Sequence, residues 1–259
     1  MQVRWLVSSR RKDLLRRRIL LGLFILLALF IAVFVGWANT PARPMPEALL
    51  ALESDDSVQV KLEEWLIFKP VKAEARVGLI FYPGGRVDPR AYAPAAKLIA
   101  SNGYLTVIVP MTLNLAVLSP SKGLDVVARF PEITHWVIGG HSLGGAMAAN
   151  LVRQHPGVFK GLVLWASYPP ESSNLAKFDL LAASVIGSRD GLVNKSVFEE
   201  SQARMPEGAI FYTIDGGNHA QFGWYGEQSG DQPATISRDR QQQEAVEITV
   251  MLLEMIAEK

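Results

Sequence analysis

The 259-residue chain contains no cysteine. This absence excludes disulfide bonds, thiolate metal sites and a cysteine nucleophile, and it leaves the redox compartment of the protein undetermined. Histidine is scarce, with four residues, and the chain has no internal repeat and no long low-complexity segment. Apolar residues make up 49% of the sequence, which suits one ordinary globular domain with a sizeable core.

Outside its N-terminal segment, the chain has no excess of basic residues over acidic ones. The whole sequence carries 26 basic and 25 acidic residues, but residues 1–18 hold seven basic residues and one acidic residue. The remainder has 19 basic and 24 acidic residues, a net charge of −5. Because affinity for phosphate backbones rests on clustered lysine and arginine, no nucleic-acid partner is expected. The N-terminal basic cluster fits membrane topology and attraction to anionic lipid head groups.

A long uncharged apolar run extends from Ile19 to Ala38. A helix of this length can cross a bilayer, and the run lacks the polar face that a buried helix of a soluble domain would need. By the positive-inside rule, the preceding basic residues place residues 1–18 in the cytoplasm and the later chain outside. Gly36-Trp37-Ala38 only loosely supplies the small-x-small site of a cleaved signal peptide, so an uncleaved signal anchor is favoured and cleavage stays the alternative.

The sequence therefore predicts four segments. These are a cytoplasmic basic segment (1–18), a transmembrane signal anchor (19–38), a linker (39–46) and a globular domain (47–259). The linker is predicted because three of its eight residues are proline, which cannot continue a helix. The globular domain is expected outside the cytoplasm, attached to the membrane by a single span.

Apolar segments of strand length alternate with helix-like segments along the globular part. The expected strands are Val77–Tyr82, Leu105–Val109, Trp136–Ile138 with its neighbours, Gly161–Trp165, Leu181–Ile186 and Ala209–Ile214, and the expected helices are Arg90–Ser101, Ser121–Arg129, Leu143–Gln154, Lys195–Arg204 and Arg238–Glu258. Strands without polar alternation, separated by helices, indicate a mostly parallel sheet covered on both faces. With an antiparallel edge hairpin at Val58–Leu62 and Trp65–Phe68, the predicted class is α/β with about eight strands.

One serine lies between glycines where a predicted strand meets a predicted helix, in Gly140-His141-Ser142-Leu143-Gly144. The chain must reverse direction there within a few residues, and glycine at 140 and 144 tolerates the close approach of strand and helix. The hydroxyl group of Ser142 is expected at the carboxyl edge of the strands, beside the positive end of a helix, where developing negative charge is stabilised. The motif alone is weak, and its place between strand and helix gives it weight.

These five residues resemble the nucleophile elbow of the α/β-hydrolase fold, in its esterase and lipase branch. The resemblance extends from about residue 58 to the C-terminus. Many members insert a lid where this chain has only the short segment 167–179, so it is similar to the lidless, dienelactone-hydrolase-like members, with an open site. The family implies a catalytic serine, an acid and a histidine in that order, each after a successive strand.

A serine hydroxyl needs a base, normally a histidine held by a carboxylate. The resemblance implies His219, which closely follows the last predicted strand. The other histidines are expected elsewhere: His141 inside the elbow, His135 before its strand and His155 at the far end of a helix. The acid implied after the preceding strand is Asp190, although an aspartate before glycine could also serve only a turn. Asp215 is the rival acid, but its place only four residues before His219 favours a role in shaping that turn.

The resemblance also implies an oxyanion hole, in which backbone N–H groups stabilise the tetrahedral intermediate. One donor is expected from Leu143, the residue after the nucleophile. The second is expected from Pro83-Gly84-Gly85-Arg86, which resembles the His-Gly-Gly of related esterases with proline in place of histidine. Because proline has no N–H, Gly85 is the expected donor and Arg86 the alternative. The glycines could also serve only a tight turn.

The sequence thus predicts a membrane-anchored serine hydrolase that cleaves carboxylic esters or thioesters of small molecules or lipids, with no metal or organic cofactor. Lipid acyl hydrolase, amidase and peptidase activities stay open, as does a non-catalytic binding module of the same fold. Phe222, Trp224 and Tyr225, just after His219, could line the substrate pocket, dip into the membrane surface or cover the sheet edge. The natural substrate and the oligomeric state are not determined by the sequence.

Overall fold

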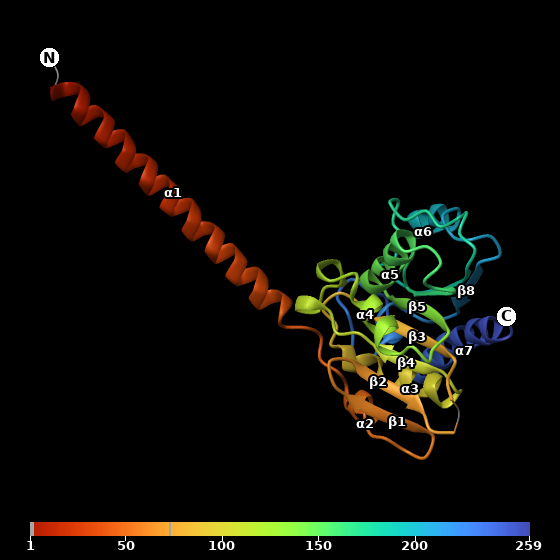
Figure 1. Ribbon diagram of the computed structural model, residues 1–259. Coiled ribbons are helices and arrows are strands. Elements are labelled where there is room, and N and C mark those ends of the chain that lie inside the picture. The colour runs from red at the N-terminus through yellow and green to blue at the C-terminus, as the bar shows by residue number, and fades with distance from the viewer. Residues whose placement is uncertain (1–2, 73) are drawn as a thin grey trace. The chain divides into compact units, whose positions relative to one another are not determined.

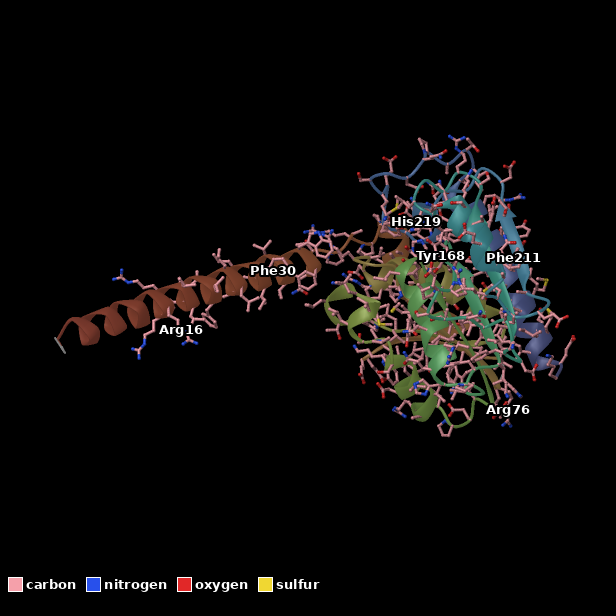
Figure 2. All side chains as sticks on the ribbon, turned by 90° about the horizontal axis from the view of Figure 1, so that it is seen from above. Arg16, Phe30, Arg76, Tyr168, Phe211 and His219 are labelled. Atoms are coloured by element: carbon pink, nitrogen blue, oxygen red, sulfur yellow. The ribbon has the colours of Figure 1, made fainter. Side chains whose placement is uncertain are left out.

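The computed structural model describes residues 3–72 and 74–259, which form two compact units divided between residues 40 and 41. The first unit is a long helix, α1 (Val3–Ala38). From Ile19 onward most of its large apolar side chains are exposed. Phe30, which Figure 2 labels on this helix, is 69% exposed. By length and composition, Arg16–Ala38 could cross a membrane, and a signal sequence would meet the same test.

The second unit is built around an eight-stranded, mostly parallel sheet (Figure 1). The strands are β1 (Val58–Leu62), β2 (Leu66–Pro70), β3 (Val77–Tyr82), β4 (Leu105–Ile108), β5 (His135–His141), β6 (Gly161–Trp165), β7 (Leu181–Gly187) and β8 (Ile210–Ile214). Their order is β1-β2-β4-β3-β5-β6-β7-β8. The β1–β2 and β2–β4 pairs are antiparallel and the others are parallel. The predicted α/β class and edge hairpin are confirmed.

The central strands lack polar alternation because helices cover both faces of the sheet. Every residue of β3 and of β6 is buried. One face packs against α3 (Ala93–Ser101) and α7 (Arg238–Ala257), and the other packs against α4 (Lys122–Arg129) and α5 (Leu143–Gln154). The core therefore consists of two hydrophobic clusters, one on each side of the sheet.

Local signals define where the remaining elements begin. Asn194 caps α6 (Lys195–Gln202) by accepting the backbone N–H of Val197 at 3.2 Å, and Ser237 caps α7 by accepting that of Arg240 at 3.2 Å. The shorter elements are α2 (Pro46–Leu50) and four turns of 3₁₀ helix: η1 (Pro89–Tyr92), η2 (Thr112–Asn114), η3 (Ala116–Leu118) and η4 (Ala220–Phe222).

Part of the segment predicted as a linker packs within the second unit. Ala42 forms an isolated parallel bridge with Val87, and the N–H of Met45 donates to the carbonyl of Trp224 at 2.8 Å. Helix α2 begins at Pro46, where a missing N–H is tolerated because first-turn N–H groups have no intrahelical acceptor. The division of the chain into cytoplasmic segment, anchor, linker and globular domain stays a prediction.

The topology brings three loops to one edge of the sheet. Strands β5, β6, β7 and β8 run parallel in adjacent positions, so their carboxyl ends meet there. The loops after β5, β7 and β8 carry Ser142, Asp190 and His219 respectively. In open α/β sheets this edge is where ligands bind.

Candidate active site

Ser142 occupies a sharp turn between β5 and α5. Its φ is 52° and its ψ is −122°, a conformation that costs a residue with a side chain about 1–3 kcal/mol. The turn is held because the N–H of Ser142 donates to the carbonyl of Trp165 at 2.9 Å and the hydroxyl of Ser167 donates to the carbonyl of Ser142 at 2.7 Å. Ser142 is the N-cap of α5, and its hydroxyl makes no capping hydrogen bond.

Two glycines allow the elbow to pack against the end of β3. A Cβ atom at Gly140 would lie 2.5 Å from the carbonyl oxygen of Tyr82, and one at Gly144 would lie 2.2 Å from the same oxygen. Both distances are far below van der Waals contact. The predicted need for glycine at these two positions is therefore confirmed, and it fixes Ser142 at the carboxyl edge of the sheet.

His219 and Asp190 form a buried hydrogen-bonded pair. Nδ1 of His219 lies 2.8 Å from Oδ2 of Asp190, and both side chains are 3% exposed. The other oxygen of Asp190, Oδ1, accepts the backbone N–H groups of Leu192 at 2.9 Å and Val193 at 2.8 Å. The carboxylate is thus fixed in the orientation that it presents to the imidazole.

The rival acid, Asp215, has a different environment. Its Oδ1 accepts a hydrogen bond from the hydroxyl of Ser188 at 3.1 Å, and the same hydroxyl oxygen accepts the N–H of Gly216 at 2.8 Å. These contacts belong to the turn after β8. The structure therefore brings Asp190, and not Asp215, to His219.

Ser142 and His219 line one cavity of about 450 Å³ at the carboxyl edge of the sheet. Tyr168, labelled near His219 in Figure 2, lines the same cavity. In the part of the chain that the structure describes, no hydrogen bond joins the hydroxyl of Ser142 to His219. Catalytic hydrogen bonds are often long without substrate and shorten when substrate binds.

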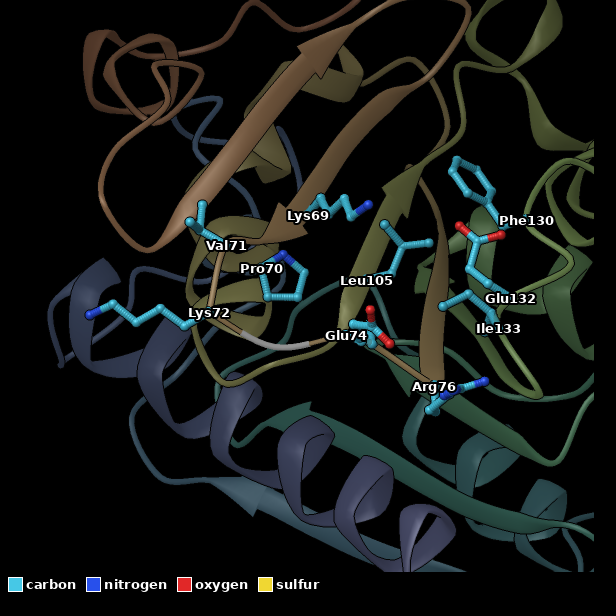
Figure 3. Close-up of a pocket in the computed structure, with 11 residues that line it drawn as sticks. Lys69, Pro70, Val71, Lys72, Glu74, Arg76, Leu105, Phe130, Glu132 and Ile133 are labelled. Carbon is cyan, nitrogen blue, oxygen red and sulfur yellow. The ribbon is translucent and has the colours of Figure 1, made fainter.

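Another cavity, whose lining residues Figure 3 shows, lies at the opposite edge of the sheet. Its volume is about 460 Å³. It is lined by Pro70 at the end of β2, by Leu105 at the start of β4 and by Arg76, directly before β3. None of the predicted site residues lines it. Because ligands of α/β sheets bind at the carboxyl ends of the strands, the cavity beside Ser142 is the candidate active site.

The two expected oxyanion donors are neighbours. A Cβ atom at Gly85 would lie 3.2 Å from Cδ2 of Leu143. Among the described residues, the backbone N–H groups of Gly85 and Leu143 have no hydrogen-bond acceptor. The alternative donor, Arg86, is already engaged, because its N–H donates to the carbonyl of Asn114 at 2.8 Å.

The model of the alpha/beta hydrolase family matches residues 78–243. The chain belongs to the alpha/beta hydrolase family. No curated protein matches the chain.

Similar solved structures share the fold of this hydrolase at low sequence identity. The ferulic acid complex of Est1E from Butyrivibrio proteoclasticus has a TM-score of 0.57 at 12% identity, covering 78% of this chain and 98% of that one. A predicted CIB-like hydrolase from Thermoplasma acidophilum has a TM-score of 0.56 at 18% identity, and the match covers 76% of this chain and 98% of that one. The esterase domain of a Rhodothermus marinus protein has a TM-score of 0.54 at 11% identity, and the match covers 72% of this chain and 90% of that one.

The aromatic residues after His219 do not line the cavity beside Ser142. Phe222, Trp224 and Tyr225 are 0%, 8% and 7% exposed. The ring centroid of Phe222 lies 6.0 Å from that of Trp165 in the core. The interpretations of these residues as pocket walls or as membrane contacts are therefore wrong, and the packing interpretation fits their burial.

A buried network that the sequence did not reveal joins the loop of Gly85 to the elbow. The N–H of Gly84 donates to the hydroxyl oxygen of Tyr92 at 2.9 Å, and that oxygen lies 2.8 Å from Nδ1 of His141. Because Tyr92 accepts from Gly84, its own proton is available for His141. Burial lowers the pKa of His141 well below the usual 6.5, and the nearby His219, 4.6 Å away between ring centroids, lowers it further. His141 is therefore neutral at neutral pH.

Proposed function

We propose that the protein is a serine hydrolase that cleaves carboxylic esters, or thioesters, through an acyl-enzyme. Ser142 attacks the acyl carbon while His219 takes the hydroxyl proton and passes it to the leaving group. Asp190 orients His219 and stabilises the imidazolium ion. The N–H groups of Leu143 and Gly85 stabilise the oxyanion. Water then attacks the acyl-enzyme, with His219 again acting as the base.

The hydrogen bond between His219 and Asp190 carries this proposal. This pair lies beside the cavity that Ser142 and His219 line together. Ser142 itself occupies the strained turn expected of a nucleophile. A buried aspartate–histidine pair needs a reason, since burying polar and ionisable groups costs free energy. Base catalysis at Ser142 supplies that reason, whereas a binding module of the same fold has no use for the pair.

The lining of the cavity favours uncharged substrate groups of modest size. Its described walls contain no carboxylate, lysine or arginine side chain: they are Leu143, Ala146, Ala166, Ser167, Tyr168, Pro170, Leu192, Val193 and Gln228, beside Ser142 and His219. A volume of about 450 Å³ lies in the lower half of the range for small-molecule sites. A small uncharged ester fits these properties better than a charged one, and lipid esters are the alternative.

Covalent labelling with a fluorophosphonate probe tests the proposal. The full chain in detergent should be labelled, and Ser142→Ala should not be. Ser101→Ala, on the exposed surface of α3, is the matched control and should label like the wild type. A wild type that neither reacts with the probe nor hydrolyses any ester would contradict the proposal and favour a binding module.

A panel of p-nitrophenyl esters of increasing acyl length separates the substrate classes. Preference for short acyl groups is expected for a hydrolase of small soluble esters. Activity on long acyl chains that rises with micelle formation would instead indicate lipid esters. Cleavage of anilides at comparable rates would indicate an amidase.

Helix α1 serves in this proposal as an uncleaved anchor, with the N-terminus in the cytoplasm and the hydrolase unit outside. The seven basic residues before the apolar run support this orientation. The protein should stay with membranes during alkaline extraction, and protease added outside intact cells should degrade the hydrolase unit. A mature protein that lacks residues 1–38 would show that the segment is a cleaved signal instead.

A further inference from the structure

Asp231 connects the two loops that carry Asp190 and His219. Its Oδ1 accepts the backbone N–H of Gly191 at 3.0 Å, and its Oδ2 accepts the backbone N–H of Ala220 at 2.8 Å. Gly191 is the residue after Asp190, and Ala220 is the residue after His219. One carboxylate therefore bridges the residues that follow the proposed acid and the proposed base.

Close backbone packing at Gly191 is a second, independent sign of this connection. A Cβ atom there would lie 2.6 Å from the carbonyl oxygen of Gly230 and 2.9 Å from the backbone nitrogen of Gln232. The loop after β7 thus lies directly against the backbone on both sides of Asp231. Any side chain at 191 would force the two segments apart.

The loop after β7 also fixes the carboxylate of Asp190. Three successive N–H groups are used there: that of Gly191 binds Asp231, and those of Leu192 and Val193 bind Asp190. A shift of Gly191 would move its neighbours Leu192 and Val193, which orient Asp190. On the other side, a shift of Ala220 would move the adjacent His219.

We propose that Asp231 is a positioning residue for the Asp190–His219 pair, holding the two loops at the separation that their hydrogen bond requires. This inference rests on the proposed function for its role in catalysis. Only a carboxylate offers two separate acceptor oxygens on so short a side chain. An asparagine at this position keeps one acceptor and can maintain only one of the two bridges.

The inference predicts a loss of turnover without a loss of substrate binding. Asp231→Ala should lower kcat for ester hydrolysis about tenfold to hundredfold, because small misplacements of catalytic groups have effects of this size. KM should change by less than about twofold, since Asp231 does not line the cavity. Gly191→Ala should give the same pattern by separating the same segments.

A spectroscopic measurement tests the positioning role without relying on activity. Proton NMR of the full chain with ¹⁵N-labelled histidine should show a low-field signal from the Nδ1–H group of His219, assigned by its loss in His219→Gln. The signal should disappear or broaden in Asp231→Ala and Gly191→Ala. Asp55→Ala is the matched control, because Asp55 also accepts two backbone N–H groups, those of Ser57 and Val58, but beside the edge strand β1. It should keep both the signal and kcat.

The outcomes separate this inference from the proposed function. A folded Asp231→Ala protein with wild-type kcat and an unchanged low-field signal overturns the inference and leaves the hydrolase proposal intact. A wild type without esterase activity overturns the hydrolase proposal, and the NMR comparison still decides the role of Asp231. A wild type without the low-field signal also overturns the inference. If circular dichroism shows that Asp231→Ala is unfolded, Asp231→Asn takes its place. Its kcat and its low-field signal then decide the role of Asp231 in the same way.

Discussion

The hydroxyl group of Tyr92 lies 2.8 Å from Nδ1 of His141, although the two residues are 49 positions apart in the sequence. The same hydroxyl accepts the N–H of Gly84, one residue before the proposed oxyanion donor Gly85. The hydroxyl oxygen of Tyr92 therefore links the loop after β3, which contains Gly84 and Gly85, to His141 at the end of β5.

Tyr92→Phe should destabilise the protein by about 1–3 kcal/mol, because it leaves buried polar groups on Gly84 and His141 without a partner. It should also lower kcat, since the loop of Gly85 loses one of its attachments. Urea unfolding, monitored by circular dichroism, measures the loss of stability, and ester hydrolysis kinetics measure the change in kcat. Tyr104→Phe removes the hydroxyl of a partly buried tyrosine away from the site and is the control. Equal effects of the two changes would contradict this role for Tyr92.

Stability should decrease as the pH falls below about 6.5, in part because of His141. Burial lowers the pKa of this residue in the folded protein, so in that pH range the unfolded chain binds more protons than the folded one. Protonation then favours unfolding. The free energy of unfolding, measured between pH 7.5 and 5, should therefore depend less steeply on pH in a folded His141→Asn variant. An identical slope in both proteins would show that His141 does not contribute.

Gly144→Ala should prevent the elbow from forming as observed. The added Cβ would meet the carbonyl oxygens of Tyr82 at 2.2 Å and Pro83 at 2.4 Å, and neither backbone atom can move without disturbing β3. We expect a loss of about 3 kcal/mol, at the upper end of ordinary overpacking, together with loss of fluorophosphonate labelling. Gly85→Ala is the milder comparison, because the nearest atom to its Cβ would be Cδ2 at the flexible end of Leu143, 3.2 Å away. A stable, normally labelled Gly144→Ala protein would refute this packing argument.

Local sequence patterns were sufficient to predict most of the fold. The helix predicted at Leu143–Gln154 has those bounds in the structure. The helix predicted from Arg90 is instead divided into η1 and α3, because Pro94 lacks an N–H and favours the first turn of a new helix. Strand β2 extends to Pro70, two residues beyond the prediction, at a position where proline can end a strand.

The sequence predicts only those residues of the candidate site that follow the order serine, acid, histidine along the chain. Ser142 was identified from its own neighbours, and Asp190 and His219 from a resemblance that assigns roles to loops. The roles of Tyr92 and Asp231 depend on contacts between distant segments, and no local spacing encodes such contacts. The sequence leaves three interpretations of the aromatic residues after His219 open, because composition does not reveal whether a loop turns its side chains toward solvent or core.

The most direct test of the central claim is to trap the acyl group on its residue. The full chain is mixed with p-nitrophenyl acetate, acid-quenched during the first turnover, digested and examined by mass spectrometry. The peptide that contains Ser142 should carry an acetyl group on that serine, and neither Ser142→Ala nor His219→Ala should accumulate it at a comparable rate. Release of p-nitrophenol with no acetyl group on Ser142, or with the acetyl group on another residue, would contradict the proposed mechanism.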